Sequence, residues 1–253
     1  MNASVQIGKS EDYRLQSALM VYGKSSYDGI PYRHPFVTMH KVNHIEGEPE
    51  LGPGQLVTPA ALIDLVLGLG FKIPTEILPE NVIVRGSDSI VWWSPAKVRM
   101  MFFSDRNNDP TMKTLNGKKY PIPALIFKVS GTQLWIRALA ENKRPGVETK
   151  LCMAPFWNCY ANATVCLGSS KIPRTKRVEQ IFEWEDSFFA SEFTHAAGNN
   201  KSCRFKGGFL AMWLSLQGQA TFPTEYLRPL NQTLKQFVEN SDGSYSNNVE
   251  GAE

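Results

Sequence analysis

The most constraining feature of the sequence is a series of short β-rich segments separated by turn residues. Each segment carries β-branched and aromatic residues, and turn signals such as Gly86-Ser87-Asp88 and Gly131 lie between them. Consecutive strands joined by such short turns pair in an antiparallel manner. The chain is therefore predicted to contain an antiparallel β-meander. Its strands are expected at 82–85, 89–93, 97–103, 124–129 and 133–139.

Helical patterns lie on either side of the meander. Thr58 is a favourable N-cap and Pro59 suits the first helical position, so a helix is predicted over 58–70. After the meander, apolar residues recur at helical spacing over 175–190, although Glu185 interrupts the apolar face. Strands grouped apart from helices indicate an α+β fold. Further elements are expected over 209–216, as a helix or a strand, and over 223–238, as a helix.

We expect the chain to be organised in three parts. Near the N-terminus, strands are predicted at 15–22 and 36–45, followed by a Gly- and Pro-rich connector at 46–54. A polar loop is predicted at 105–119. The last residues are rich in Ser, Asn and Gly, which predicts disorder. The parts are an N-terminal strand and helix extension at 1–78, a core at 79–240 and a disordered tail at 241–253.

Composition narrows the classes of protein to which the chain can belong. Lys and Arg total 27 against 24 Asp and Glu, so the net charge of +3 does not predict a nucleic-acid-binding protein. Four cysteines in 253 residues are no disulfide framework. The longest apolar run, 60–71, contains Asp64 and is too short to span a membrane, and residues 1–9 lack the apolar core of a signal peptide. We therefore expect a cytoplasmic protein with reduced thiols.

Candidate chemistry is concentrated in the segment 156–168, at the end of the strand-rich region. Asn158 precedes Cys166 by eight residues, with a loop-like Tyr160-Ala161-Asn162-Ala163 between them. A thiol and a side-chain amide can face each other across a loop of this length. Such a pair suits acyl transfer, in which a thiolate attacks a carbonyl carbon and an amide N–H stabilises the oxyanion.

Other interpretations of these thiols stay open. Most cysteines in folded proteins are small buried hydrophobic residues. Cys152, Cys159 and Cys166 are evenly spaced, but the two-residue spacing of zinc knuckles is missing, so we predict neither a metal site nor a cofactor. His195 could pair with Cys166 in a thiol hydrolase, because such pairs form in three dimensions at any sequence spacing.

The segment around Cys166 resembles the active site of ubiquitin-conjugating enzymes. That family carries His-Pro-Asn, a short turn and a catalytic Cys followed by Leu, with the same interval between Asn and Cys. Here the triplet reads Phe156-Trp157-Asn158 and the cysteine is followed by Leu167, so the Asn and Cys match while the His and Pro do not. The resemblance implies that Cys166 is the nucleophile and Asn158 the oxyanion donor. Phe156 and Trp157 are possible accessory residues, since aromatic packing could hold the loop in place of the His.

Four further segments extend the resemblance across residues 36–230. They are 37–42; 91–95 with Arg99 and Phe102-Phe103; Arg144-Pro145 with Ala154-Pro155; and 188–195. Together they are similar to the PRTRC system protein B family, a bacterial ubiquitin-conjugating-like branch associated with plasmids. This implies a carrier that holds a ubiquitin-like modifier as a cysteine thioester and transfers it to an amine or thiol. The missing His and Pro leave an alternative, an inactive scaffold or plasmid-maintenance interaction module.

The same resemblance implies a set of partners. These are a ThiF-class adenylating activating enzyme, a small ubiquitin-like protein and a metal-dependent deconjugating peptidase. The residues themselves predict no membrane association and make nucleic acid an improbable ligand.

Overall fold

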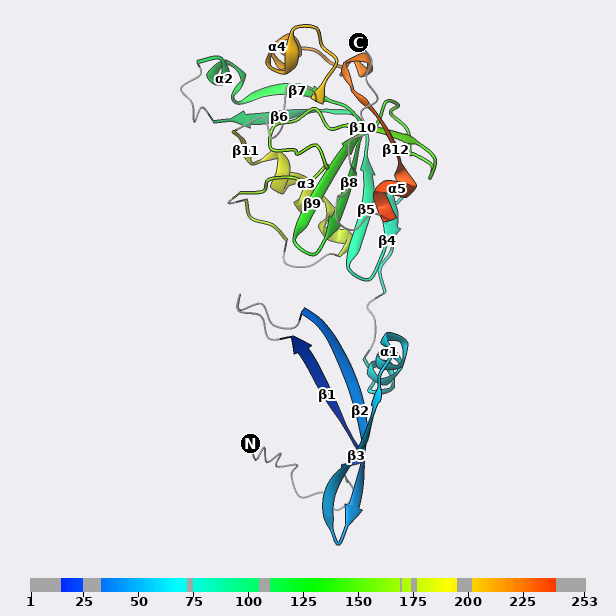
Figure 1. The fold of residues 1–253 in the computed structure, drawn as a ribbon. Helices are drawn as coiled ribbons and strands as arrows, with labels where there is room; N and C mark the ends of the chain where they lie inside the picture. Colours follow the sequence, from blue (N-terminus) through cyan, green and yellow to red (C-terminus); the bar gives the residue numbers. More distant parts are fainter. Residues whose placement is uncertain are drawn as a thin grey trace. The chain divides into compact units, whose positions relative to one another are not determined.

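The computed structural model of the chain describes residues 15–24, 33–71, 75–104, 110–168, 170–173, 177–194 and 202–239. It divides into two compact units, residues 1–75 and residues 76–253, which are called unit 1 and unit 2 here and are considered separately (Figure 1). The predicted disordered tail at 241–253 lies outside the described residues. Within the described residues, no helix is both long enough and apolar enough to cross a membrane.

Unit 1 consists of one antiparallel sheet and one helix. The sheet has the order β1-β2-β3, with β1 at Ser17–Lys24, β2 at Arg33–Ile45 and β3 at Glu48–Leu56. Helix α1 spans Pro59–Gly68, and the Thr58 side chain caps it by accepting a hydrogen bond from the Ala61 N–H at 3.2 Å, as the sequence predicted. The predicted connector at 46–54 is wrong, because most of it forms strand β3. Pro49 and Pro53 are compatible with this strand because β3 lies at the edge of the sheet.

The main element of unit 2 is a curled six-stranded antiparallel sheet (Figure 1). Its strand order is β12-β10-β9-β8-β5-β4, so the strands predicted at 82–85 and 89–93 pair with each other, as do those at 124–129 and 133–139. The strand predicted at 97–103 leaves this sheet for a smaller one, and β5 pairs with β8 instead. The α+β fold class is therefore confirmed. The strands are β4 at Val82–Arg85, β5 at Ser89–Ser94, β8 at Leu125–Ser130, β9 at Gln133–Ala138, β10 at Lys150–Met153 and β12 at Pro229–Thr233.

A smaller sheet and several short helices complete unit 2. The sheet has the order β11-β6-β7, with β6 at Lys97–Phe103, β7 at Lys118–Ile122 and β11 at Glu192–Phe193, and β11 runs parallel to β6. The predicted helices near 175–190 and 209–216 are present as α3 and α4. The helices are α2 at Pro110–Leu115, α3 at Ile181–Phe189, α4 at Gly208–Ser215 and α5 at Leu234–Glu239, with 3-10 turns at Val178–Gln180 and Thr224–Tyr226.

Two predicted elements are corrected by the structure. The helix predicted over 223–238 is replaced by a 3-10 turn, β12 and α5. Pro229 interrupts the helical register, and β12 pairs with the edge of β10 through Lys150 opposite Thr233 and Cys152 opposite Pro229. The loop predicted over 105–119 contains α2 and the start of β7 in its described part. Met112 and Leu115 of α2 are buried, so tertiary packing stabilises a helix that local sequence did not indicate.

The six-stranded sheet is covered on both faces. Trp92 belongs to the large core that includes α3 and α4, whereas Trp93 packs on the opposite face in a smaller core with Leu234 and Phe237 of α5. The two adjacent indoles thus lie on opposite faces of the sheet, as the two-residue period of a strand requires. A sheet with both faces covered provides a rigid support for the segments attached to its edges.

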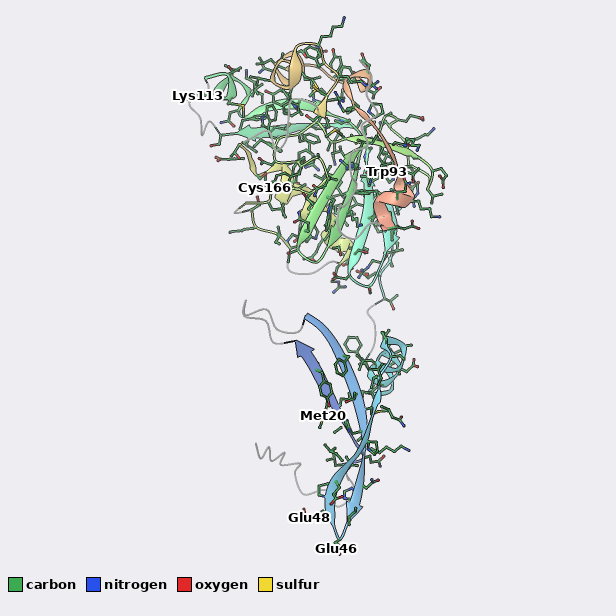
Figure 2. All side chains as sticks on the ribbon, viewed as in Figure 1. Met20, Glu46, Glu48, Trp93, Lys113 and Cys166 are labelled. Atoms are coloured by element: carbon green, nitrogen blue, oxygen red, sulfur yellow. The ribbon has the colours of Figure 1, made fainter. Side chains whose placement is uncertain are left out.

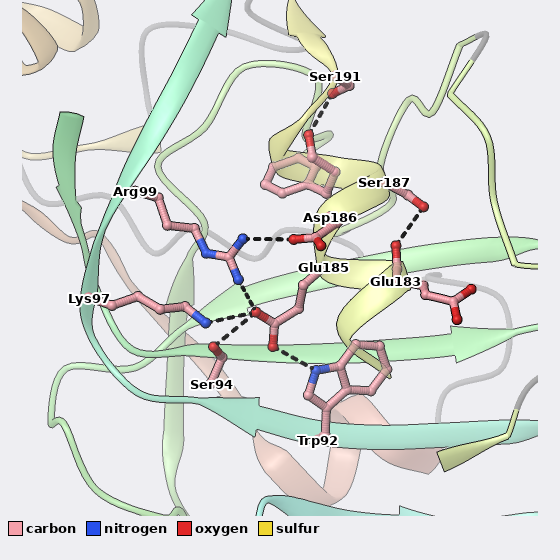
Figure 3. A network of polar contacts seen from close by, with 10 residues as sticks. Trp92, Ser94, Lys97, Arg99, Glu183, Glu185, Asp186, Ser187 and Ser191 are labelled. Atoms are coloured by element: carbon pink, nitrogen blue, oxygen red, sulfur yellow. Dashed lines mark hydrogen bonds and ion pairs between the residues drawn. The ribbon is translucent and has the colours of Figure 1, made fainter. Parts of the chain in front are cut away.

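Helix α3 is fixed to the sheets by a buried carboxylate. Glu185, 1% exposed, accepts hydrogen bonds from Trp92 Nε1 at 3.2 Å and Ser94 Oγ at 3.3 Å of β5. It also pairs with Lys97 Nζ at 2.8 Å and Arg99 Nη2 at 2.6 Å of β6 (Figure 3). The residue that interrupts the apolar face in the sequence thus collects four donors from two strands, as a buried charge requires.

Candidate functional site

The segment that carries Asn158 and Cys166 is a β-hairpin. The Tyr160 N–H donates to the Thr164 carbonyl at 2.8 Å, and the Cys166 N–H donates to the Asn158 carbonyl at 2.8 Å. Cys159 lies opposite Val165 between these two pairs. Asn158 and Cys166 are therefore direct cross-strand partners at the open end of the hairpin.

The hairpin is attached to strand β9 of the main sheet. The Val165 N–H donates to the Leu134 carbonyl at 2.9 Å, and the Ile136 N–H donates to the Ala163 carbonyl at 2.9 Å. Ala163 has a φ of 76°, an unfavourable backbone conformation for a residue with a Cβ. Two backbone hydrogen bonds hold it there, from its N–H to the Tyr160 carbonyl and from the Ile136 N–H to its carbonyl. The position of Cys166 is thus set by the rigid sheet rather than by a free loop.

Side-chain alternation along the hairpin separates its two cysteines. Cys159 and Val165 point into the core and are buried. Tyr160 and Cys166 lie on the other face, where Tyr160 is exposed and Cys166 is partly exposed. The remaining cysteines, Cys152 and Cys203, are buried. Cys166 is therefore the one of the four thiols that a macromolecule can reach.

Tyr160 is a neighbour of Cys166 that the sequence interpretation did not select. The negative charge of a Cys166 thiolate and a side-chain hydrogen bond between the two groups raise the pKa of Tyr160. In a hairpin, a residue lies near the diagonal partner on the same face, and Tyr160 is diagonal to Cys166. Recognition of the hairpin register in the sequence would have been enough to identify it.

Asn158 is held tightly at the inner side of the hairpin. Its side chain is buried, and its backbone φ of 59° lies in the left-handed region that Asn tolerates better than most residues. Nδ2 donates to the Glu192 carbonyl at 3.0 Å, while Oδ1 accepts from the Thr194 N–H at 3.3 Å and the Thr194 hydroxyl at 3.4 Å. The amide therefore ties the hairpin to β11 and the residue after it.

Aromatic residues occupy the two positions before Asn158. Phe156 packs against Phe188, Phe189 and Phe193, with ring centroids 5.5 to 6.5 Å apart. Trp157 lies 4.4 Å from the Phe209 ring of α4 and contacts the rings of Phe103 and Trp213. Both side chains are buried, so they anchor the entrance of the hairpin in the core.

The remaining candidates from the sequence are the other cysteines, a metal site and His195. Burial raises the pKa values of the thiols of Cys152, Cys159 and Cys203, which disfavours their reactive thiolate forms. No group of three or more metal-ligating side chains occurs in the described part of the chain. His195 lies outside the described residues.

Fold and sequence comparison together define the class of this protein. The curled antiparallel sheet with few flanking helices is consistent with the E2-like fold, the fold of ubiquitin-conjugating enzymes. The family model of prokaryotic E2 family D matches residues 65–230, which is more than half of the chain, and the chain belongs to that family. The match begins within α1 and leaves the sheet of unit 1 outside it. Comparisons with curated proteins and with solved structures found no match.

Proposed function

We propose that this protein is a ubiquitin-conjugating-like carrier that holds a ubiquitin-like modifier as a thioester on Cys166. The observation that carries the proposal is the position of this thiol. It is the partly exposed cysteine of the chain, and it projects from a hairpin fixed to the sheet of an E2-like protein. A carrier needs such a thiol because two macromolecules must reach it in turn.

The proposed reaction consists of two acyl transfers. The Cys166 thiolate attacks the carbonyl carbon of a modifier thioester on an activating enzyme, whose thiolate leaves. A substrate amine or thiol then attacks the new thioester, and Cys166 leaves as thiolate while the amine loses a proton to solvent. The first step exchanges one thioester for another, so it needs no strong general base beside the nucleophile. The second step with an amine needs stabilisation of a tetrahedral oxyanion.

Two neighbours of Cys166 have proposed roles. Asn158 is the candidate oxyanion donor, since its amide carries two N–H groups and only one is engaged by the Glu192 carbonyl in the described residues. Tyr160 can donate its hydroxyl hydrogen to the Cys166 thiolate and so stabilise the attacking and leaving forms of the nucleophile.

Family membership also supports proposed partners. E2-like proteins act with an activating enzyme and a ubiquitin-like protein, so we assign those two partner types to this chain. The resemblance of its segments to PRTRC system protein B further suggests a ThiF-class activating enzyme and an associated deconjugating peptidase. This finer assignment is tested by the identity of the enzyme that charges Cys166.

A charging assay tests the proposed nucleophile. The protein is incubated with the activating enzyme, ATP and the modifier, and adducts are separated on a non-reducing gel. Wild type should form an adduct that reductant removes, as should Cys152→Ala and Cys159→Ala. Cys166→Ala should form none, and Cys166→Ser should form an oxyester that resists reductant. An adduct in Cys166→Ala would place the nucleophile elsewhere, and a chain that never charges beside a charged activating enzyme would be a scaffold.

The same assay separates the roles of the two neighbours. Asn158→Ala should still charge but should discharge onto amines on the order of a hundredfold more slowly, the typical effect of one lost oxyanion donor. Tyr160→Phe keeps the ring and removes the hydroxyl, and it should slow both steps by about 2- to 10-fold, the effect of one net hydrogen bond. Unchanged discharge in Asn158→Ala would restrict Asn158 to holding the hairpin.

A further inference from the structure

The described residues of unit 1 form no buried core of their own. None of its described residues is buried, and helix α1 buries no side chain although eight of its ten residues are apolar. Fifteen large hydrophobic side chains of unit 1 are exposed, including Leu19, Val21 and Met39. At about half exposure each they present roughly 1,000 Å² of apolar surface, which exceeds the roughly 800 Å² that each partner buries in a standard interface. Unit 1 therefore has enough apolar surface for a stable dimer.

The two edges of the unit 1 sheet differ in their protection. The β3 edge carries Glu48 and Glu50 together with Pro49 and Pro53, residues that discourage further strand pairing. The β1 edge carries Ser-Ala-Leu-Met-Val-Tyr-Gly over residues 17–23, without charge or proline, and its one charged residue is Lys24 at the end of the strand. An apolar edge strand without such residues pairs readily with another strand. Among the described strands of unit 1, β1 thus offers the edge that is open to a partner.

The backbone register of β1 shows which residues face this open edge. The Val42 N–H donates to the Gln16 carbonyl at 2.9 Å, and the register of the pair continues with Ala18 opposite His40 and Met20 opposite Thr38. In an antiparallel ladder, alternate residues direct their N–H and C=O groups to the same side. Even-numbered residues of β1 up to Tyr22 therefore bond to β2, while the backbone groups of residues 17, 19 and 21 point outward. The register shifts between Tyr22 and Lys24, where the regular alternation ends.

We propose that β1 pairs with β1 of a second copy of this chain, antiparallel about a two-fold axis at Met20 (Figure 2). This register places Leu19 opposite the partner's Val21, and Ser17 opposite the partner's Gly23 beside the register shift of β1. Leu19 and Val21 are both odd-numbered, so their outward backbone groups meet in hydrogen-bonded pairs. The two three-stranded sheets become one six-stranded sheet with no unprotected edge.

The side chains in this register are compatible on both faces. Leu19 and Val21 join the same residues of the partner, next to Met39 and Val37 of each β2 strand. On the other face, Met20 meets its own counterpart on the axis, and Ala18 meets the partner's Tyr22. Because residues 17–23 carry no charge, the two-fold pairing brings no like charges together. Such a self-complementary strand favours a second copy over an unrelated partner.

Measurement of the molar mass of the full chain tests the proposal. Wild type should sediment at micromolar concentration with twice the chain mass of 28.4 kDa. Leu19→Lys with Val21→Lys should halve the mass, because lysines would then face each other across the axis. Leu19→Glu with Val21→Lys should restore the dimer, because each Glu would face a Lys of the partner. The matched control, Ile45→Lys with Leu51→Lys, adds the same charge away from the β1 edge and should stay dimeric.

A cross-linking experiment tests the position of the axis. In a Cys166→Ser background, Met20→Cys should form an intermolecular disulfide, because non-hydrogen-bonded partners have Cα atoms about 4.5 Å apart, within the range of a disulfide. Leu19→Cys is the control, since its counterpart lies diagonally and should cross-link several-fold more slowly.

Three outcomes would overturn the proposal. A monomeric wild type would mean that unit 2 or another protein covers unit 1. A dimer that persists in the double lysine variant would place the interface elsewhere. Equal cross-linking of Leu19→Cys and Met20→Cys would contradict this register.

Discussion

Unit 1 and unit 2 are both built from antiparallel strands rich in apolar residues, but within the described parts of the chain only the sheets of unit 2 are covered by other elements. In unit 2, α3 and α4 bring an aromatic cluster that includes Phe156, Phe188 and Trp213 onto one face of the sheet, and α5 covers the other. In unit 1, the similarly apolar helix α1 buries nothing. Strand pattern alone therefore does not determine burial; a second layer on the sheet does.

The largest expected effect comes from the aromatic cluster of unit 2. Trp213 is fully buried, and its Nε1 donates to the Pro155 carbonyl at 3.0 Å. Trp213→Ala should lower the free energy of unfolding by about 3–5 kcal/mol, because it leaves a cavity and an unpaired carbonyl. Leu69→Ala, at a unit 1 residue that is 78% exposed, should change it by less than about 0.5 kcal/mol. Urea denaturation measures the free energy of unfolding of both variants. Similar losses of stability would contradict the difference in burial between unit 1 and unit 2.

The second effect concerns the polar bonds that hold α3. Glu185→Ala removes the acceptor of four donors and should destabilise unit 2 by about 1–3 kcal/mol. Asp186 is the matched control, since it also contacts Arg99 but is exposed, and Asp186→Ala should cost about 0–1 kcal/mol. Thermal unfolding followed by near-UV circular dichroism compares the two. Equal losses of stability in Glu185→Ala and Asp186→Ala would mean that burial does not strengthen the hydrogen bonds and ion pairs of Glu185.

A smaller effect depends on pH. Glu76 accepts from Arg85 and from the Val178 N–H at 3.0 Å, at the start of the helical segment that leads into α3. The side-chain hydrogen bond from Arg85 is the main cause that lowers the pKa of Glu76 below its ordinary value of 4.5. The stabilisation is therefore complete above that value and is lost as the pH falls through the lower, folded pKa.

Glu76→Gln measures this contribution directly. The variant should be less stable than wild type at neutral pH, by under about 1 kcal/mol, and the difference should shrink on acidification below pH 4.5. Glu80→Gln changes an exposed carboxylate nearby and serves as the control. A difference between Glu76→Gln and wild type that is independent of pH would show that the charge of Glu76 contributes nothing.

The smallest expected effect is that of removing unit 1. All six tryptophans lie in unit 2, so tryptophan fluorescence reports on that unit alone. Residues 76–253 alone should unfold within about 0.5 kcal/mol of the full chain, because unit 2 has its own core. A large loss of stability in this fragment would mean that the two units stabilise each other, and the contrast between them would fail.

Features that depend on local sequence could be predicted. The strands of the meander follow from β-branched residues between turn signals, and α1 begins where Thr58-Pro59 indicated. The opposite placement of Trp92 and Trp93 follows from the two-residue period of a strand.

Features that depend on distant residues could not be predicted. Glu185 looked like a defect in an amphipathic helix because its four donors lie about 90 residues earlier in the chain. Strand β12 exists because the edge of β10 pairs with it, although the leucine spacing favoured a helix. The amide bonds of Asn158 to Glu192 and Thr194 link segments that no local pattern connects, and the oxyanion role of Asn158 stays a prediction.

The central claim is that Cys166 carries the modifier. The most direct measurement is peptide mapping by mass spectrometry of the Cys166→Ser protein after incubation with activating enzyme, ATP and modifier, because its oxyester survives digestion. Trypsin releases positions 152, 159 and 166 together in the peptide 151–171, so fragment ions of this peptide must locate the modification. We expect the C-terminal remnant of the modifier at position 166, and not at Cys152, Cys159 or Cys203. A remnant at another residue, or an unmodified chain beside a charged activating enzyme, would contradict the account.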